Sequence, residues 1–319
     1  ASANDHTFVA LPEITTVVEK TSMILGNDLS IMFAFTADDI VGENNYAVIT
    51  KTYADGTASR TEQIEQTAWG EPIVINGKNY YAISFSGVAA KEMTDKVQVQ
   101  IFNEDGKAIS EVFTDSIRDY AMRMIENGTN VQMFVDMLVY GAEAQKQFDN
   151  YAINDLAISQ LTAEQLAQAT PTVNCKNNLV ANDKYRASSL ILENNIKLLF
   201  LFAGIDPTMT ATISYEDHYG NTQNIIVEGT NFAPVTYQGE NCYSITVDKL
   251  VVADARHLVS VVVNDADGNE IASASDSVES YIARMSTTST LYESILKFAD
   301  FKQIHLFFKL TLKMYNCTT

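Results

Sequence analysis

The sequence predicts an α+β protein made of two tandem β-sandwich-like domains, each followed by an antiparallel helical hairpin. Three observations lead to this fold class. The chain contains one unit twice, apolar residues alternate with a period of two through most of each unit, and the period becomes about 3.6 near the end of each unit. The clearest repeated stretch is DSIRDYAMRM, Asp115 to Met124, which returns as DSVESYIARM, Asp276 to Met285.

The repetition extends well upstream of this stretch. VQVQIFNEDGKAIS (97–110) aligns with VSVVVNDADGNEIA (259–272), and TSMILGNDLSIMFAF (21–35) aligns with SSLILENNIKLLFLF (188–202). The offset between the copies falls from 167 to 161 residues along the chain, as short differences in loop length would produce. The sequence therefore predicts four segments: a lead-in over 1–9, a first repeat domain over 10–168, a second over 169–301 and a C-terminal amphipathic tail over 302–319.

Strands are expected through the first two thirds of each repeat. In the first copy Tyr46 to Tyr53 alternates, with Ala47 and Ile49 on one face, and Val97 begins another alternating run that ends at Phe102. Asn76-Gly77 separates two β-rich runs and is the strongest short hairpin signal. Six to eight strands per repeat are predicted, which is the content of a sandwich.

Helices are expected after the strands. Ile117, Tyr120, Ala121 and Met124 share one face of the first, and Asp115 or Ser116 is its expected N-cap. Thr162 to Gln165 has the spacing of a capping box. The predicted helices are 116–126, 131–148 and 162–169 in the first repeat and 276–285 and 291–301 in the second.

Composition limits the function classes. The chain has 319 residues, 46% of them hydrophobic, and a net charge of −19, which argues against a nucleic-acid partner because phosphates attract clustered Lys and Arg. No apolar run is long enough to span a membrane. Three cysteines, Cys175, Cys242 and Cys317, lack any CxxC spacing, so one or more buried free thiols are expected and not a disulfide framework.

Two polar clusters are candidates for a metal or catalytic site. The four histidines lack the spacing of a metal site, and Glu216 to Tyr219 is interpreted as a solvated hairpin turn. Asp265 to Glu270 resembles the start of a calcium loop, but its glycine stands at the fourth place instead of the sixth, so a plain hairpin turn is favoured. No catalytic, cofactor-binding or metal-binding residue and no cofactor is predicted.

Aromatic residues offer one candidate binding surface. Trp69 with Tyr80 and Tyr81 could stack on sugar rings, although Tyr81 recurs as Tyr243 at a strand position, which favours a core role for it. Trp69 has no counterpart in the second repeat. It is either a loop residue or a binding residue that the copies do not share.

The stretches YYAISFSGVAAKEMTD (80–95), DSIRDYAMRM and VDMLVYGAEAQ (135–145) resemble a repeat of large secreted surface proteins of anaerobic Gram-positive gut bacteria. The resemblance covers most of the first repeat and weakens in the second. It implies a surface location and a structural class of role, but no functional residues.

The tail suggests assembly. Apolar residues alternate from Phe308 to Met314, and no acidic residue follows Asp300 in this acidic chain. Such a strand could complete the sheet of a neighbouring subunit, pack on its own repeat, or be peculiar to this sequence.

We therefore expect a non-enzymatic protein, extracellular or at the cell surface, that serves as a stalk, surface-layer or fibre subunit. Its partners would be other copies of itself or cell-surface components, as a homo-oligomer or polymer. The opening ASANDHTFV suits a secreted chain after leader cleavage, and a fragment equally. The alternatives are a glycan-binding module of a polysaccharide-degrading or adhesion system and, more weakly, a hydrolase with a site between the domains.

Overall fold

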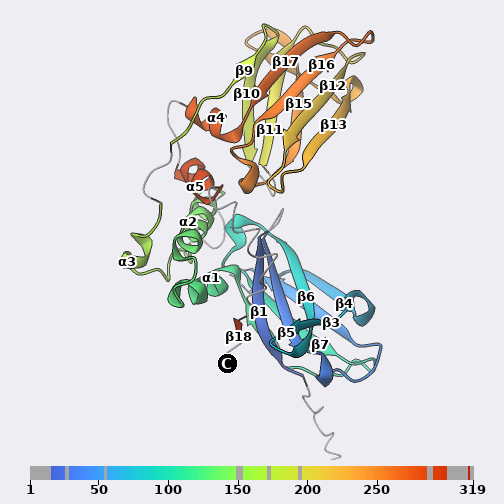
Figure 1. Cartoon of the computed structure of the whole chain (residues 1–319), viewed down its shortest axis with the longest axis vertical. Coiled ribbons are helices and arrows are strands. Elements are labelled where there is room, and N and C mark those ends of the chain that lie inside the picture. Colours follow the sequence, from blue (N-terminus) through green and yellow to red (C-terminus); the bar gives the residue numbers. More distant parts are fainter. Residues whose placement is uncertain are drawn as a thin grey trace, which may run out of the picture. The chain divides into compact units, whose positions relative to one another are not determined.

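A computed structural model describes residues 16–25, 29–53, 56–148, 154–170, 174–192, 196–285, 290–299 and 315–316. By its contacts the chain divides into two compact units. The first comprises Ala1–Arg123, Asp149–Ala157 and Phe308–Thr319, and the second comprises Met124–Phe148 and Ile158–Phe307. Both are built mainly of antiparallel strands, drawn in blue to cyan and in yellow to orange in Figure 1.

The first unit contains two sheets, with the strand orders β18-β1-β2-β6-β5 and β4-β3-β7-β8. Their strands are β1 (Val18–Leu25), β2 (Leu29–Thr36), β3 (Tyr46–Thr52), β4 (Ala58–Glu65), β5 (Ile73–Ile75), β6 (Lys78–Val88), β7 (Lys96–Phe102), β8 (Phe113–Asp115) and β18 (Tyr315–Asn316).

The second unit contains two sheets with the orders β10-β11-β15-β14 and β13-β12-β16-β17-β9. If β10 is matched to β1 and each later strand to its successor up to β17 and β8, the two pairs of sheets have the same order. Among the strands that the structure describes, β9 and β18 lack counterparts. The strands are β9 (Val180–Ala181), β10 (Tyr185–Leu192), β11 (Ile196–Ala203), β12 (Thr210–Glu216), β13 (Thr222–Glu228), β14 (Ala233–Tyr237), β15 (Glu240–Leu250), β16 (Val259–Asn264) and β17 (Glu270–Asp276).

The register shifts between strands recur in the second unit, as the strand order does. The register of β1 on β2 shifts between Val18 and Lys20, and that of β10 on β11 shifts between Tyr185 and Ala187, 167 residues later. The register of β2 on β6 shifts at Leu29, and that of β11 on β15 at Ile196, again 167 residues later. Bulges are specific features of a strand pair, so their recurrence is independent evidence for the duplication.

The predicted period-two patterns are confirmed where they were clearest. In β3, Ala47, Ile49 and Lys51 are buried while their neighbours are half-exposed. In β7 and β16 every second residue from Val97 and from Val259 is buried. The hairpin at Asn76-Gly77 also forms as expected, and both residues adopt positive φ, 51° and 80°.

The helices lie close to the expected ranges. They are α1 (Ile117–Glu126), α2 (Val131–Gln147), α3 (Ala163–Leu166), α4 (Val278–Ala283) and α5 (Thr290–Ala299). The capping box at Thr162 forms, because its hydroxyl accepts from Gln165 N at 3.1 Å and the Gln165 side chain accepts from Thr162 N at 2.9 Å.

The prediction that α2 would form a hairpin with the preceding helix does not describe its packing. α2 packs along α5, from the other repeat, and the rings of Tyr140 and Phe298 stack with centroids 6.0 Å apart. Thr290, at the start of α5, donates a hydrogen bond to Glu143 of α2. Because the helical pattern gives only the apolar face of each helix, it does not say which neighbour covers that face.

Most of the predicted tail, 302–314 and 317–319, lies outside the described residues, as does the lead-in, 1–9. Tyr315 and Asn316 form β18, which pairs antiparallel with β1. The registered partners are Lys20 with Asn316 and Thr21 with Tyr315. No helix in the described part of the chain has the length and apolarity that crossing a bilayer requires.

Candidate functional site

The repeated DSIRDYAMRM stretch builds an ion pair with a buried carboxylate at the start of α1. Asp115 ends β8 and is buried, and Arg123 lies two turns into α1. The guanidinium of Arg123 grips both carboxylate oxygens of Asp115, with Nη1 3.1 Å from Oδ1 and Nη2 bonded to Oδ2. Nη2 also donates to Thr21 Oγ1 in β1 at 3.1 Å. The pair therefore ties the helix to two strands, and we call it the Asp–Arg clasp.

The second repeat contains the same clasp with a serine in place of threonine. Arg284 Nη1 and Nη2 lie 3.0 and 2.5 Å from Oδ1 and Oδ2 of Asp276, which is fully buried. Ser188 Oγ, in β10, donates to Asp276 Oδ2 at 2.6 Å. Burial opposes the charge of Arg284, but its hydrogen bonds to Asp276 outweigh burial and raise the pKa of the guanidinium above its usual range.

The serine after each aspartate caps the helix. Ser116 Oγ accepts from Asp119 N and Ser277 Oγ accepts from Ser280 N, both at 3.0 Å. The preceding carboxylates each accept from the N–H of that serine at 2.9 Å. The recurring polar residues of the stretch thus satisfy the free N–H groups of a helix start and lock it to the sheets.

A second recurring feature is a carboxylate on a short 3₁₀ helix, at η3 (Ala90–Glu92) and η5 (Val252–Asp254). Glu92 accepts from Ala89 N at 3.0 Å and pairs with Lys51 Nζ at 2.7 Å. Asp254 accepts from Val251 N at 3.0 Å and lies 3.0 Å from His218 Nδ1.

His218 was expected on a solvated turn, and that expectation is wrong for its side chain, which is only 5% exposed. The turn itself forms, with Asp217 Oδ1 accepting from Tyr219 N and Asn221 N, both at 2.9 Å. The ring folds inward because Asp254 offers it a buried partner, which a local sequence pattern cannot reveal.

The residues interpreted as a calcium loop or a turn form a turn. Asp265 Oδ1 accepts from the backbone N–H groups of Asp267 and Asn269, both at 2.9 Å. In the first repeat Asn103 Oδ1 does the same for Asp105 and Lys107. The Asp265 oxygen is thus engaged with the backbone, as in an Asx turn. No group of three or more His, Cys, Asp or Glu side chains that could hold a metal occurs among the described residues.

Trp69 is a core residue and not a sugar-stacking surface. It is 6% exposed, and its Nε1 donates to the carbonyl of Ile64 at 3.0 Å. Its ring meets Phe35 and Tyr81 edge-on, with centroids 5.1 and 5.4 Å away. Since Trp69 closes the core beside β2 and β6, its face is not available to a ligand.

The cysteines follow the expectation in part. Cys242 is buried and free, while Cys175 is free but half-exposed. Burial, followed by the negative charge of Glu279, raises the pKa of the Cys175 thiol, which disfavours the reactive thiolate. Cys317 lies outside the described residues.

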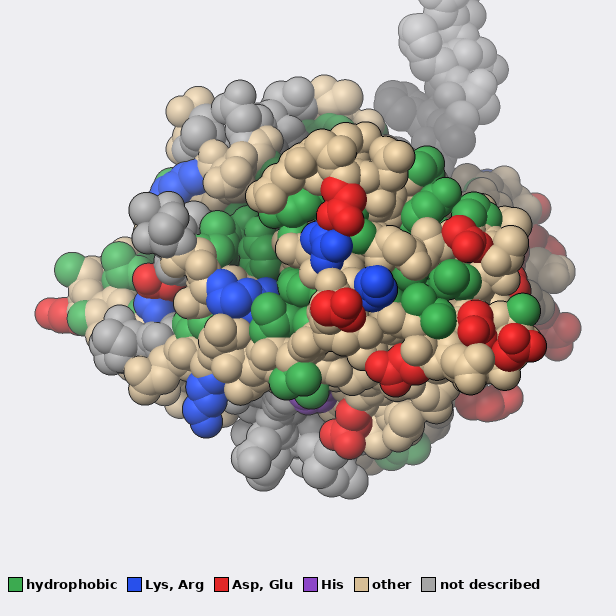
Figure 2. All heavy atoms as spheres, turned by 90° about the horizontal axis from the view of Figure 1, so that it is seen from above, with side chains coloured by type: hydrophobic (Ala, Val, Ile, Leu, Met, Phe, Trp, Pro, Cys, Tyr) green, Lys and Arg blue, Asp and Glu red, His purple; other side chains and the backbone are tan. Residues whose placement is uncertain are grey.

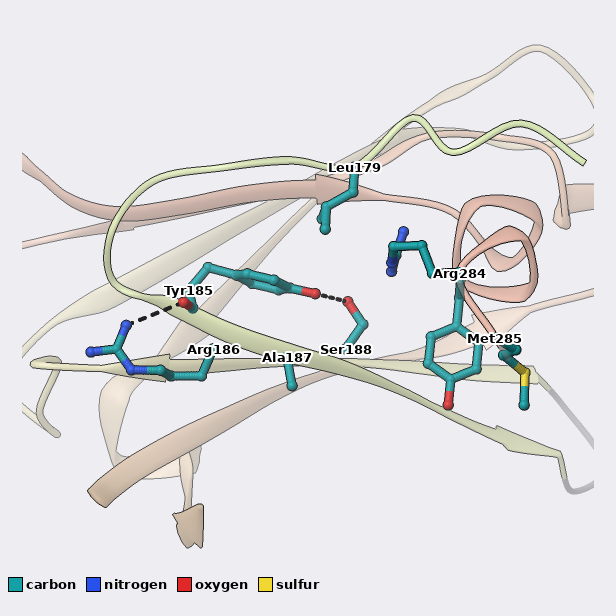
Figure 3. A pocket seen from close by; sticks show the side chains of 8 residues that line it. Leu179, Tyr185, Arg186, Ala187, Ser188, Arg284 and Met285 are labelled. Carbon is teal, nitrogen blue, oxygen red and sulfur yellow. Dashed lines mark hydrogen bonds between the residues drawn. The ribbon is translucent and has the colours of Figure 1, made fainter. Parts of the chain in front are cut away.

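A shallow cavity of about 380 Å³ lies beside β10, where sequence reasoning placed nothing. Figure 3 shows Tyr185, Ala187 and Ser188 along β10, with Leu179 and Arg284 facing them from the strap before β9 and from the end of α4. Tyr185 Oη and Ser188 Oγ are 2.7 Å apart. The alignment of β10 with β1 was the signal that could have drawn attention to this edge.

Acidic and basic side chains are mixed on the surface of this acidic chain. On the face drawn in Figure 2, Asp and Glu side chains are interspersed with Lys and Arg, and the basic side chains do not merge into one continuous area. This distribution gives no track for a phosphate backbone on that face.

Comparison with known proteins leaves the family open. No protein-family model matches the chain, and no curated protein matches it. One similar solved structure is the tetra-tandem repeat in the extending region of a large adhesion protein, with 12% identity, 83% of this chain covered and a TM-score of 0.19. This chain covers 49% of that one. Another is a cytokine receptor complex, with 7% identity, 81% and 96% of the two chains covered and a TM-score of 0.18. Scores this low carry no argument about fold or function.

Proposed function

We propose that the chain is a non-enzymatic structural or assembly protein of the cell exterior, a subunit of a stalk, surface layer or fibre built from a duplicated domain. The observation that carries the proposal is the Asp–Arg clasp. The polar residues that both copies keep are engaged in fixing a helix to strands, and a catalytic site needs polar groups that converge on space for a substrate.

The surroundings of the other polar groups point the same way. The carboxylates of η3 and η5 and the side chains of Asn103 and Asp265 hold turns. Rigid turns and clasped helices maintain a shape, which is what a spacer must do. The glycan-binding alternative loses Trp69 as its stacking surface, because that ring is buried in the core.

The test is assembly of the full-length chain. Sedimentation over a range of protein concentrations, with negative-stain microscopy of the same samples, should show oligomers or filaments that grow with concentration. The chain ending at Asp300 serves as the comparison and should assemble less. A monomer at every concentration, together with glycan-array binding, would reject the proposal in favour of a binding module.

A further inference from the structure

The outer edge of β10 is open where the matching edge of β1 is occupied. β1 pairs with β2 on one side and with β18 on the other, at Lys20 and Thr21. The same positions of the second repeat are Ala187 and Ser188. β10 pairs with β11, and among the described strands nothing pairs with its other edge.

The side chains at these positions are more exposed in β10 than in β1. Thr21 and Ser22 are each 2% exposed, whereas Ser188 is half-exposed and Ser189 is exposed. Met23 is fully buried, and its counterpart Leu190 is half-exposed. The duplicated strand is therefore less covered in the second repeat, although its pairing with the inner neighbour is unchanged.

The cavity beside β10 lies at the open positions. Ala187 and Ser188 are among its lining residues, with Leu179 and Arg284 opposite them (Figure 3). In the first repeat the edge at Lys20 and Thr21 takes up an antiparallel strand. The cavity thus combines a strand edge, whose N–H and C=O groups can pair with an added chain, with space beside that edge.

We infer that this edge and cavity accept an added strand, Tyr315–Asn316 with its flanking residues, from a second copy of the chain. The inference rests on the proposed assembly function and names the contact that would produce it. The occupant follows from the first repeat, where that strand pairs with the matching positions. A second copy is required because the chain's own Tyr315 and Asn316 pair with its own β1.

Charge favours the same occupant. The residues after Asp300 include Lys302, Lys309 and Lys313 and no carboxylate side chain, while the whole chain has a net charge of −19. Beside β10 the carboxylates of Asp183 and Glu240 are paired with Lys184 and Arg186, so the local charges are largely balanced and the attraction comes from the charge of the whole copy. A basic segment is thus drawn towards an acidic copy, an attraction that salt would weaken.

One strand per chain cannot occupy both edges at once. A copy that lends its strand to the β10 edge of a neighbour leaves its own β1, so pairing within the chain competes with pairing between chains. Because only the second depends on protein concentration, dilute chains remain single and concentrated chains join head to tail.

The test uses two full-length chains that each carry one new cysteine, in a background with Cys175→Ser and Cys317→Ser. One chain carries Ala187→Cys and the other, lengthened by a tag, carries Asn316→Cys. Directly opposed residues of antiparallel strands lie about 4.5–5.5 Å apart at Cα, within the range that a disulfide bridges. Mild oxidation of the mixture should give a covalent heterodimer on a non-reducing gel.

The matched control carries Ile191→Cys in place of Ala187→Cys. Ile191 is on the same strand and exposed, but lies about 13 Å further along it, so it should cross-link to Asn316→Cys far less. Circular dichroism of each variant verifies that it is folded. Equal cross-linking of the two positions, or none, would overturn the inference.

Sedimentation of the same chains distinguishes a wrong β10 contact from a wrong assembly function. Oligomers without the cross-link at position 187 would leave assembly standing and remove the β10 site. Single chains at all concentrations and no cross-link would remove both.

Discussion

At the residue scale, the clasp should be the costliest polar feature to break. Arg284→Met removes the charge that balances the fully buried Asp276, and loss of one partner of a buried pair costs about 3–5 kcal/mol. We expect that decrease in the free energy of unfolding of the second unit, measured with urea.

Two further variants show whether the cost comes from the uncompensated charge. Asp276→Asn combined with Arg284→Met should cost less than Arg284→Met alone, because no lone charge stays buried. Arg186→Met, which breaks the exposed pair with Glu240, should change stability little. A double variant as unstable as Arg284→Met alone would contradict this account.

Asp119 should make the first unit sensitive to acid. Burial acts to raise the pKa of its carboxyl, but hydrogen bonding and attraction to Lys96 outweigh burial and hold the pKa below its usual range. A carboxyl with a depressed folded-state pKa stabilises the fold above the unfolded-state pKa of about 3.9, and that contribution is lost as the pH falls through the folded-state value.

Thermal unfolding followed between pH 7 and pH 2 should therefore show a smaller loss of stability below about pH 4 for Asp119→Asn than for the unchanged chain. Lys96→Gln should flatten the profile in the same way, and combining the two changes should add little. Unchanged acid profiles in both variants would show that the pair does not couple stability to pH.

At the scale of single elements, the turn before β17 should be indifferent to calcium. Asp265 holds two backbone N–H groups, and Asn103 does the same in the first repeat with an uncharged side chain. Asp265→Asn should therefore leave the melting temperature almost unchanged, and Asp265→Ala should lower it. Neither calcium nor EDTA should shift the melting temperature of the unchanged chain, as followed by circular dichroism.

Elements were predictable where the determining contacts are local. The alternation of Ala47 and Ile49, the turn at Asn76-Gly77 and the capping box at Thr162 each depend on a few neighbouring residues, and each formed as expected. The partners of α2, His218 and Trp69 depend on residues far along the chain, so a periodic pattern could not name them.

The clasp lies between these cases. Asp115 or Ser116 was the expected N-cap, but Arg123 was not assigned to either residue. Its signal was present, because aspartate and arginine recur eight residues apart in both copies of the stretch. A spacing of opposite charges that recurs in both copies is informative, because a spacing kept in two diverged copies indicates a shared contact. The cavity beside β10 had no local signal of this kind. The alignment with β1 identifies the strand, but it does not show that no strand pairs with its outer edge.

At the scale of the whole molecule, the two units should unfold as separate steps. Each has its own paired sheets and its own clasp. The chain has a single tryptophan, Trp69, buried in the first unit, so its fluorescence reports that unit alone.

Urea unfolding followed by tryptophan fluorescence and by far-ultraviolet circular dichroism should separate the two steps. Arg284→Met should leave the fluorescence transition in place and move part of the dichroism transition to lower urea. Arg123→Met should shift the fluorescence transition instead. If Arg284→Met also moved the fluorescence transition, the units would be unfolding as one.

The bonds of each clasp close within a single copy: a strand end, the first two turns of the helix that follows, and one hydroxyl from an early strand. A gene segment that encodes one copy therefore encodes all the residues of one clasp, so the clasp is kept when the segment is duplicated. The packing of α2 on α5, which joins the two copies, would instead have to be matched anew.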